Sequence, residues 1–204
     1  MRRRMHLAIL AASLLASPAA HADTTTFPLS IAVAQQAGAP VRDEAWIREQ
    51  IAQANALFAP AGVGFRWTLA KDLRARIELH SRADRDALAD ETEPRGVVDI
   101  FVVAALEDVD EPGRMRKGVC WTHKGDGKRY VVVSAIAPPG VLAHELGHFF
   151  GNPHTTVADN LMSYERTGGP VSFDDAQLDR IRTFSRRFLE TGRLLEAPVP
   201  RFLP

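Results

Sequence analysis

Cysteine is almost missing from this sequence, since Cys120 is the only one among 204 residues. A single thiol excludes an intramolecular disulfide, so cross-links within the chain cannot stabilise the fold. Internal repeats and low-complexity tracts are missing as well, which argues against a repeat architecture. Hydrophobic residues make up 46% of the chain, enough for the core of one domain or of one domain divided by a cleft.

Long apolar runs are also missing. No stretch reaches the ~20 consecutive apolar residues that a membrane-spanning helix needs. The short apolar segment 7–16 follows a basic start and precedes Ala20-His21-Ala22, which fits a small-x-small cleavage site. This order predicts a secretory signal peptide over residues 1–22, a mature chain that begins at Asp23, and export to the periplasm or the medium.

Neither sign of charge is in excess. The sequence has 25 Lys and Arg against 25 Asp and Glu, and without the three arginines of the signal peptide the mature chain has 22 basic and 25 acidic residues, a net charge of −3. This balance gives no reason to expect nucleic acid or an anionic membrane as a partner. Five arginines near the C-terminus are expected on the solvated face of a helix: Arg180, Arg182, Arg186, Arg187 and Arg193.

Histidine supplies the most specific pattern in the chain, which reads His144-Glu145-x-x-His148-x-x-Gly151-x-x-His154. Residues four apart on an α-helix project from the same side, one turn above the other, so His144 and His148 can share one Zn²⁺. The opposite side of the helix carries four apolar residues that suit the core: Leu142, Leu146, Phe149 and Phe150.

A sharp turn is expected after this helix. Gly151 can adopt the left-handed conformation that ends a helix, and Pro153 cannot continue one. His154 can then return to the metal as a third ligand and leave a fourth position for water, as in catalytic zinc sites. Met162 follows eight residues later, within the candidate Met-turn 160–164. The alternative is a zinc-binding fold without activity, although metal binding alone does not require Glu145.

A histidine pattern of this spacing, followed by a Met-turn, is the signature of the metzincins. Over residues 144–164 the sequence resembles a metzincin zinc peptidase. The resemblance implies an α+β fold with an α/β-like N-terminal part. Its expected components are a twisted, mostly parallel sheet, an active-site helix below the cleft, and a small C-terminal subdomain that ends in a helix.

Two further positions bear on the metzincin subfamily. Thr155 follows the third histidine, where the adamalysin, astacin, matrixin and serralysin groups have Asp, Glu, Ser or Pro. The subfamily is therefore not assigned by the sequence. Tyr164, two residues after Met162, is similar to the astacin and serralysin pattern, in which that tyrosine lies beside the zinc.

Each of these residues has an expected role. The three histidines bind Zn²⁺ as neutral imidazoles, and Glu145 takes a proton from the attacking water and passes it to the leaving amine. Tyr164 donates to the tetrahedral oxyanion, with a structural tyrosine bonded to a backbone group as the alternative. Met162 packs beneath the histidines without touching the metal, or is an ordinary core methionine.

The rest of the chain predicts strands and helices in mixed order. A strand, a helix and a strand within residues 28–69 favour a parallel pair with a crossover helix. Asp43 and Ser81 are helix N-cap candidates, and Ser172 is expected to cap the last helix. The expected strands are 28–36, 63–69, 76–80, 97–104, 117–122 and 130–136, and the expected helices are 44–58, 81–90 and 173–190.

Three local features leave alternatives open. Cys120, in a predicted strand, is expected to be a buried, unreactive thiol; the alternatives are a zinc-directed thiolate and pairing with a second chain. His123, beside the turn of the hairpin 117–136, is an exposed polar residue or a substrate contact. The segment 107–111 holds four acids and is a solvated loop or a calcium site, without an EF-hand pattern.

The predicted organisation is a signal peptide (1–22), a peptidase domain (23–196) and an extended or loose tail (197–204). The domain divides into an N-terminal subdomain to about residue 151 and a C-terminal subdomain, 152–196. We expect a monomeric, exported, zinc-dependent endopeptidase that acts on a protein or peptide. The alternatives are a zinc-binding recognition module without activity and an amidase that acts on a non-protein amide such as a cell-wall cross-link.

Overall fold

The computed structural model describes residues 24–198. The predicted signal peptide and positions 199–204 of the predicted tail lie outside the described residues. Among those described, no helix combines the length and the apolar character that crossing a membrane requires.

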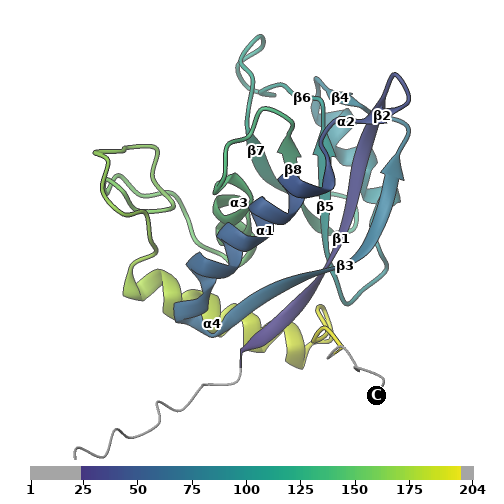
Figure 1. Ribbon diagram of the computed structural model, residues 1–204. Coiled ribbons are helices and arrows are strands. Elements are labelled where there is room, and N and C mark those ends of the chain that lie inside the picture. Colours follow the sequence, from purple (N-terminus) through teal and green to yellow (C-terminus); the bar gives the residue numbers. More distant parts are fainter. Residues whose placement is uncertain (1–23, 199–204) are drawn as a thin grey trace, which may run out of the picture.

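A twisted, mostly parallel sheet forms the centre of the molecule (Figure 1). From one edge to the other its long strands follow the order β3, β1, β5, β8, β7, and the short β2 pairs with the end of β1. All neighbours among the long strands are parallel except β7 and β8, which form the predicted antiparallel hairpin. The strands are β1 (Thr25–Gln36), β2 (Ala39–Pro40), β3 (Val63–Leu73), β5 (Val98–Val103), β7 (Gly118–Thr122) and β8 (Arg129–Ser134).

Both faces of the sheet are covered, as a parallel sheet requires. Successive side chains of a strand point to opposite faces, so Ile31 and Val33 of β1 join one core cluster while Ala32 and Ala34 join the other. The first cluster lies under α1 (Glu44–Phe58) and α3 (Val141–Phe149). The second contains residues of η2 (Ala87–Glu91), which follows α2 (Arg82–Asp86), and of the small sheet of β4 (Glu78–Leu79) and β6 (Ala105–Leu106).

The predicted crossover is confirmed, because α1 connects the parallel strands β1 and β3. Asp43 caps this helix by accepting a hydrogen bond from the Trp46 amide at 2.9 Å. The short 3₁₀ turn η1 (Ala59–Ala61) then leads into β3. Ile47, Ala54 and Phe58 face the core, as their spacing predicts.

Two predicted helices differ from the structure. Ser81 caps α2 as predicted, but this helix ends at Asp86 and the chain continues as the 3₁₀ turn η2, in which Leu88 and Ala89 are buried. Ser172 does not cap the last helix: the N-cap of α4 (Asp175–Glu190) is Asp174, which forms a capping box with Gln177. The backbone of Ser172 instead bonds to the Met-turn segment, since its carbonyl accepts the Leu161 amide at 2.7 Å.

Helix α4 closes the molecule from below (Figure 1). Its predicted apolar side is confirmed, with Ile181 and Phe188 buried and Leu178 and Phe184 packed against the core. The Phe188 ring lies 5.6 Å from that of Phe149, at the end of α3, and such aromatic pairs contribute about 0.5–1.5 kcal/mol beyond their burial. This contact anchors the C-terminal segment against the helix that carries two of the site histidines.

Candidate metal centre

Helix α3 and the chain that returns beneath it bring the three histidines together. The Nε2 atom of His154 lies 3.2 Å from Nε2 of His144 and 3.0 Å from Nε2 of His148. Two nitrogens of a tetrahedral zinc site with bonds of ~2.0–2.1 Å are about 3.3–3.4 Å apart. The donor set therefore fits a metal ion. It is the single cluster of three or more His, Cys, Asp or Glu side chains with suitable spacing in residues 24–198.

Hydrogen bonds on the far side of two rings fix which nitrogen faces the metal. Nδ1 of His144 lies 2.7 Å from the Leu161 carbonyl, and Nδ1 of His148 lies 2.7 Å from the Asn152 carbonyl. A carbonyl only accepts, so Nδ1 carries the proton and Nε2 keeps its lone pair, as metal-binding imidazoles require. Burial lowers the pKa of all three histidines, that of His148 to about 4, so the rings are neutral at pH 7.

The turn after α3 depends on Gly151, whose backbone φ is +87°. A Cβ there would lie 2.6 Å from the Phe184 ring, so both the conformation and the space require glycine. The amide of Gly151 bonds to the His148 carbonyl and that of Asn152 to the Gly147 carbonyl, at 2.9 and 3.0 Å. This tight turn directs the chain back toward His154.

Met162 lies directly beneath the helix and is fully buried. A Cβ on Gly147 would come within 2.5 Å of the Met162 sulfur, so the thioether occupies the space that a side chain at this helix position would fill. Met162 therefore packs against the backbone between the two helical histidines. Gly147 is a site residue that the motif spacing did not single out.

A buried amide pair holds the Met-turn in place. Asn160 and Gln177 exchange two side-chain hydrogen bonds of 2.9 and 3.1 Å, and both are buried. The side-chain oxygen of Asn160, Oδ1, also accepts a hydrogen bond from the Met162 backbone amide at 2.8 Å. Helix α4 thus positions the Met-turn through Gln177, a contact the sequence pattern did not reveal.

Glu145 points from α3 toward β7 and is 6% exposed. Burial raises the pKa of its carboxyl to about 8, and a hydrogen bond from the backbone of Cys120 opposes the shift. A divalent cation held by the histidines would lower that pKa again, because it favours the ionised carboxylate. Gly118 makes this position possible, since a Cβ there would lie 2.8 Å from the Glu145 side chain.

Tyr164 stands on the open side of the histidines. Its hydroxyl lies 3.0 Å from Nε2 of His154, and the two ring centroids are 4.8 Å apart. The side chain is 70% exposed, and within residues 24–198 its hydroxyl bonds to His154 and to no backbone group. The hydroxyl therefore lies next to the position that a metal would occupy.

Two cavities meet beside Glu145, along the edge strand β7. One of about 390 Å³ extends toward Cys120, Arg129 and His148, and the other, of about 550 Å³, extends toward Lys117, Val141 and Val171. Together they form an open cleft in front of the histidines. Cys120 lines the first cavity, but burial raises the pKa of its thiol to about 12, which favours the unreactive thiol over a thiolate.

The other candidate residues lie elsewhere. His123 bonds through Nδ1 to Asp126 at 2.7 Å in the hairpin turn and lines neither cavity of the cleft. The four acids of segment 107–111 each face a basic side chain, in the pairs Glu107–His80, Asp108–Arg116, Asp110–Arg82 and Glu111–Arg114. These pairs describe a loop tied to its neighbours by ion pairs.

Comparison of the sequence with protein-family models gives no match, and no curated protein matches it. The fold, in contrast, is similar to several solved structures. Mirolysin of Tannerella forsythia, in complex with a compound, has a TM-score of 0.67 at 13% identity, with 87% of this chain and 100% of that chain covered. Archaemetzincin from Methanopyrus kandleri has a TM-score of 0.54 at 16% identity, covering 80% of this chain and 97% of that chain.

A third similar structure is metalloproteinase-II from Bacteroides fragilis, with a TM-score of 0.55 at 14% identity and coverage of 82% of this chain and 55% of that chain. The predicted fold class is thereby confirmed: the chain has the mixed α+β fold of metzincin-type metallopeptidases.

Proposed function

We propose that the chain is an exported, zinc-dependent endopeptidase of the metzincin type. The observation that carries the proposal is the position of the three neutral imidazoles, whose Nε2 atoms lie close together beside the buried carboxyl group of Glu145 in an open cleft. When bound there, Zn²⁺ lowers the pKa of its water from 15.7 toward ~7 and polarises the scissile carbonyl. The similarity to peptidase structures supports the same conclusion.

In this proposal the protein side chains move the protons. Glu145 accepts the proton of the attacking water and delivers it to the leaving amine, which general acid–base catalysis requires of a carboxylate beside the reacting atoms. Tyr164 donates its hydroxyl proton in a hydrogen bond to the oxygen that becomes negative in the transition state. His144, His148 and His154 hold the metal, while Gly151 and Met162 hold the histidines.

An extended peptide has a docking edge next to these groups. Strand β7 pairs with β8 on one side and forms an edge of the sheet on the other. Its residues Gly118, Val119 and Cys120 line the cleft with Glu145. An edge strand offers unpaired backbone groups, so a substrate can add to the sheet as a further strand. This mode of binding favours peptides over other amides.

The proposed function is tested with Glu145→Gln, which keeps the size of the side chain but removes the base. We expect the purified wild-type protein to contain about one zinc per chain and to cleave a denatured protein until a chelator removes the metal. The variant should keep its zinc and lose activity by ~10²–10⁴-fold.

Other results would support an alternative. Zinc bound without cleavage of any peptide indicates a recognition module, and release of products from wall fragments but not from proteins indicates an amidase for a non-protein amide. A protein that takes up no zinc from solution contradicts all three. Export is part of the proposal and is supported by the sequence pattern of residues 1–22; the mass of the protein recovered from culture medium or periplasm tests cleavage before Asp23.

A further inference from the structure

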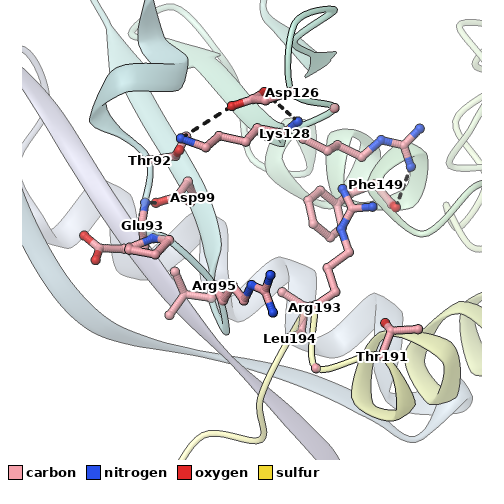
Figure 2. Close-up of a pocket in the computed structure, with 15 residues that line it drawn as sticks. Thr92, Glu93, Arg95, Asp99, Asp126, Lys128, Phe149, Thr191, Arg193 and Leu194 are labelled. Carbon is pink, nitrogen blue, oxygen red and sulfur yellow. Dashed lines mark hydrogen bonds and ion pairs between the residues drawn. The ribbon is translucent and has the colours of Figure 1, made fainter.

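A third cavity, apart from the metal centre, lies between the start of β5 and β8, the end of α3 and the segment that follows α4 (Figure 2). Its volume is about 430 Å³. In Figure 2, Arg95, Arg193 and Leu194 form one wall, and Asp126 and Lys128 lie across the cavity from them. The metal ligands do not line it, so it has no part in holding zinc.

Among the described side chains that line this cavity, more basic than acidic groups are left without an ion-pair partner. Of the acids, Glu93 pairs with Lys71, and Asp126 pairs with His123 and Lys128. Asp99 remains as the one unpaired carboxyl group of the lining among the described residues. Three arginines face the cavity without an ion pair in residues 24–198, namely Arg95, Arg129 and Arg193.

The fold ties the backbone beside Arg95 to that of Arg193. A parallel bridge joins Gly96 to Leu194, and the Gly96 amide donates to the Arg193 carbonyl at 3.0 Å, so Arg193 is bonded to the residue that follows Arg95. Gly96 has a φ of +90°, and a Cβ there would touch Leu195 at 3.0 Å, which makes this junction specific for glycine. The Arg193 guanidinium also lies over the Phe188 ring, 5.3 Å from its centroid.

Arg129 is anchored separately. One of its guanidinium nitrogens donates to the Phe149 carbonyl at 3.0 Å, and its Nε donates to the Thr122 hydroxyl at 3.3 Å. Burial and the nearby Arg129 charge both lower the pKa of Arg193. An anion bound between like charges would relieve this repulsion and accept hydrogen bonds from planar, preorganised donors.

The cavity also adjoins the catalytic cleft. Arg129 lines both this cavity and the one that contains Glu145 and His148. Thr122 and Arg129 form the last residue pair of the β7–β8 hairpin, two residues beyond Cys120, which lies in the cleft. Two residues of an extended chain span about 7 Å. A peptide added along β7 would therefore reach Arg129, which bonds to Thr122, within roughly two to four residues of the bond that is cleaved, and Arg95 and Arg193 line the same cavity as Arg129.

We propose that Arg95, Arg129 and Arg193 form an anion-binding subsite that receives an acidic side chain of the peptide substrate, a few residues from the scissile bond. The substrate part of this inference rests on the proposed peptidase function, whereas the binding of an anion does not. The substrate class is thus a peptide with Asp or Glu at a fixed distance from the cleaved bond.

Binding is tested first, with inorganic phosphate as the probe. The assay measures thermal unfolding and therefore does not depend on the proposed catalysis. Thermal unfolding is followed at constant pH and ionic strength as phosphate replaces chloride, for the wild type, Arg95→Gln and Arg193→Gln. Arg186→Gln is the matched control, because Arg186 is exposed on α4 and does not line the cavity. A ligand that binds only the folded protein raises the melting temperature.

We expect phosphate to stabilise the wild type and the control equally, and to stabilise Arg95→Gln and Arg193→Gln at most half as much. Arg95 lies in an exposed loop, so its variant keeps the fold even if loss of Arg193 disturbs the packing on Phe188. Equal stabilisation of all four proteins, or none of the wild type, overturns the anion site whether or not the protein is a peptidase.

Substrate preference is tested second, with peptides that differ only by Glu or Gln at successive positions on either side of the cleaved bond. The kcat/KM ratio of the Glu peptide to its Gln counterpart should reach roughly 5–10 at one position, as expected for a partly exposed charge-assisted hydrogen bond. Arg95→Gln and Arg193→Gln should bring the ratio toward 1, and Arg186→Gln should not. A wild-type ratio near 1 at every position overturns the substrate assignment, while absence of any cleavage contradicts the proposed function and leaves the phosphate result to decide the site.

Discussion

Gly118 determines how closely β7 can approach the carboxyl group of Glu145. A methyl group at residue 118 would lie 2.8 Å from both Cγ and Oε1 of Glu145 and 2.8 Å from Val141. These are side-chain atoms, so Glu145 would have to rotate away from its place. We expect Gly118→Ala to lower kcat by ~10–10²-fold, because a displacement of about 1 Å of a catalytic group has such effects.

The double variant Gly118→Ala/Glu145→Gln separates displacement of the base from other damage. If Gly118 acts through Glu145, the alanine should cost little in the Glu145→Gln background, since the two effects share one partner. Zinc content should stay near one per chain in all three variants. Fully additive losses would show that Gly118 has a role independent of Glu145.

The Tyr164 hydroxyl, 3.0 Å from His154, leads to a different kinetic result. Tyr164→Phe removes only this hydroxyl. If it donates to the oxyanion in the transition state alone, kcat should fall by ~10–10³-fold with little change in KM. Because the side chain is 70% exposed, the melting temperature should barely change. A less stable variant with normal kcat would instead indicate a structural tyrosine.

Some residues of the site could be predicted and others could not, for a physical reason. The three histidines, Glu145 and Gly151 follow from helical geometry and turn chemistry within eleven consecutive residues, 144–154. Gly118 comes from a strand that the fold brings to the helix from far along the chain. Its role is the absence of a side chain, and the sequence does not show what would occupy that space.

Among the elements, the Met-turn and α4 are coupled by the buried pair of Asn160 and Gln177. Asn160→Ala would leave the Gln177 amide and the Met162 amide without their partner. We expect the free energy of unfolding to fall by about 1–3 kcal/mol, and the melting temperature by roughly 2–4 °C for each kcal/mol. Denaturant and thermal unfolding measure the change.

A matched pair of apolar residues provides the control for this prediction. Asn160→Leu/Gln177→Met leaves no side-chain amide of the pair without its partner, although the backbone amides of Met162 and Asp174 still lose their acceptors. The double variant should therefore be less destabilised than the sum of its single variants. Additive losses would show that the two side chains contribute independently to stability.

The bounds of a helix could be predicted from the sequence where its N-cap and its apolar spacing indicate the same segment. Helix α1 matches its predicted bounds because a capping Asp43 and a consistent apolar spacing indicate the same segment. The start of α4 was misplaced by two residues because Ser172 and Asp174 are both acceptable caps. Only the tertiary bonds of Ser172 to the Met-turn, together with the capping box of Asp174 with Gln177, decide between them.

For the whole molecule, Asp99 at the start of β5 makes stability depend on pH. Burial raises the pKa of its carboxyl from 3.8 to about 6. Between these values the folded protein holds a proton on Asp99 that the unfolded chain has lost, so the contribution of Asp99 to stability falls as pH rises from about 4 to 6 and is constant above that range. The two-unit shift corresponds to on the order of 3 kcal/mol.

The variant Asp99→Asn isolates this effect, because the amide does not titrate and its oxygen can still accept the Glu93 amide, which is 3.1 Å from Asp99. The difference in free energy of unfolding between the two proteins should change in favour of the variant as pH rises from 4 to 6. A difference that is the same at pH 4 and pH 7 would mean that the Asp99 carboxyl titrates normally in the folded protein.

The two ends of the described chain meet at the foot of β1. The Ala197 amide donates to the Thr26 carbonyl at 2.7 Å, and Ala197 is buried. The backbone therefore traces an almost closed ring. A short linker could join these ends, and new ends could be opened in the exposed loop at Pro112 and Gly113. This rearrangement would keep the layers of the fold and the contacts between its helices and strands. In such a circularly permuted chain the metal-binding helix would be synthesised soon after the new start, before the crossover unit that supports it.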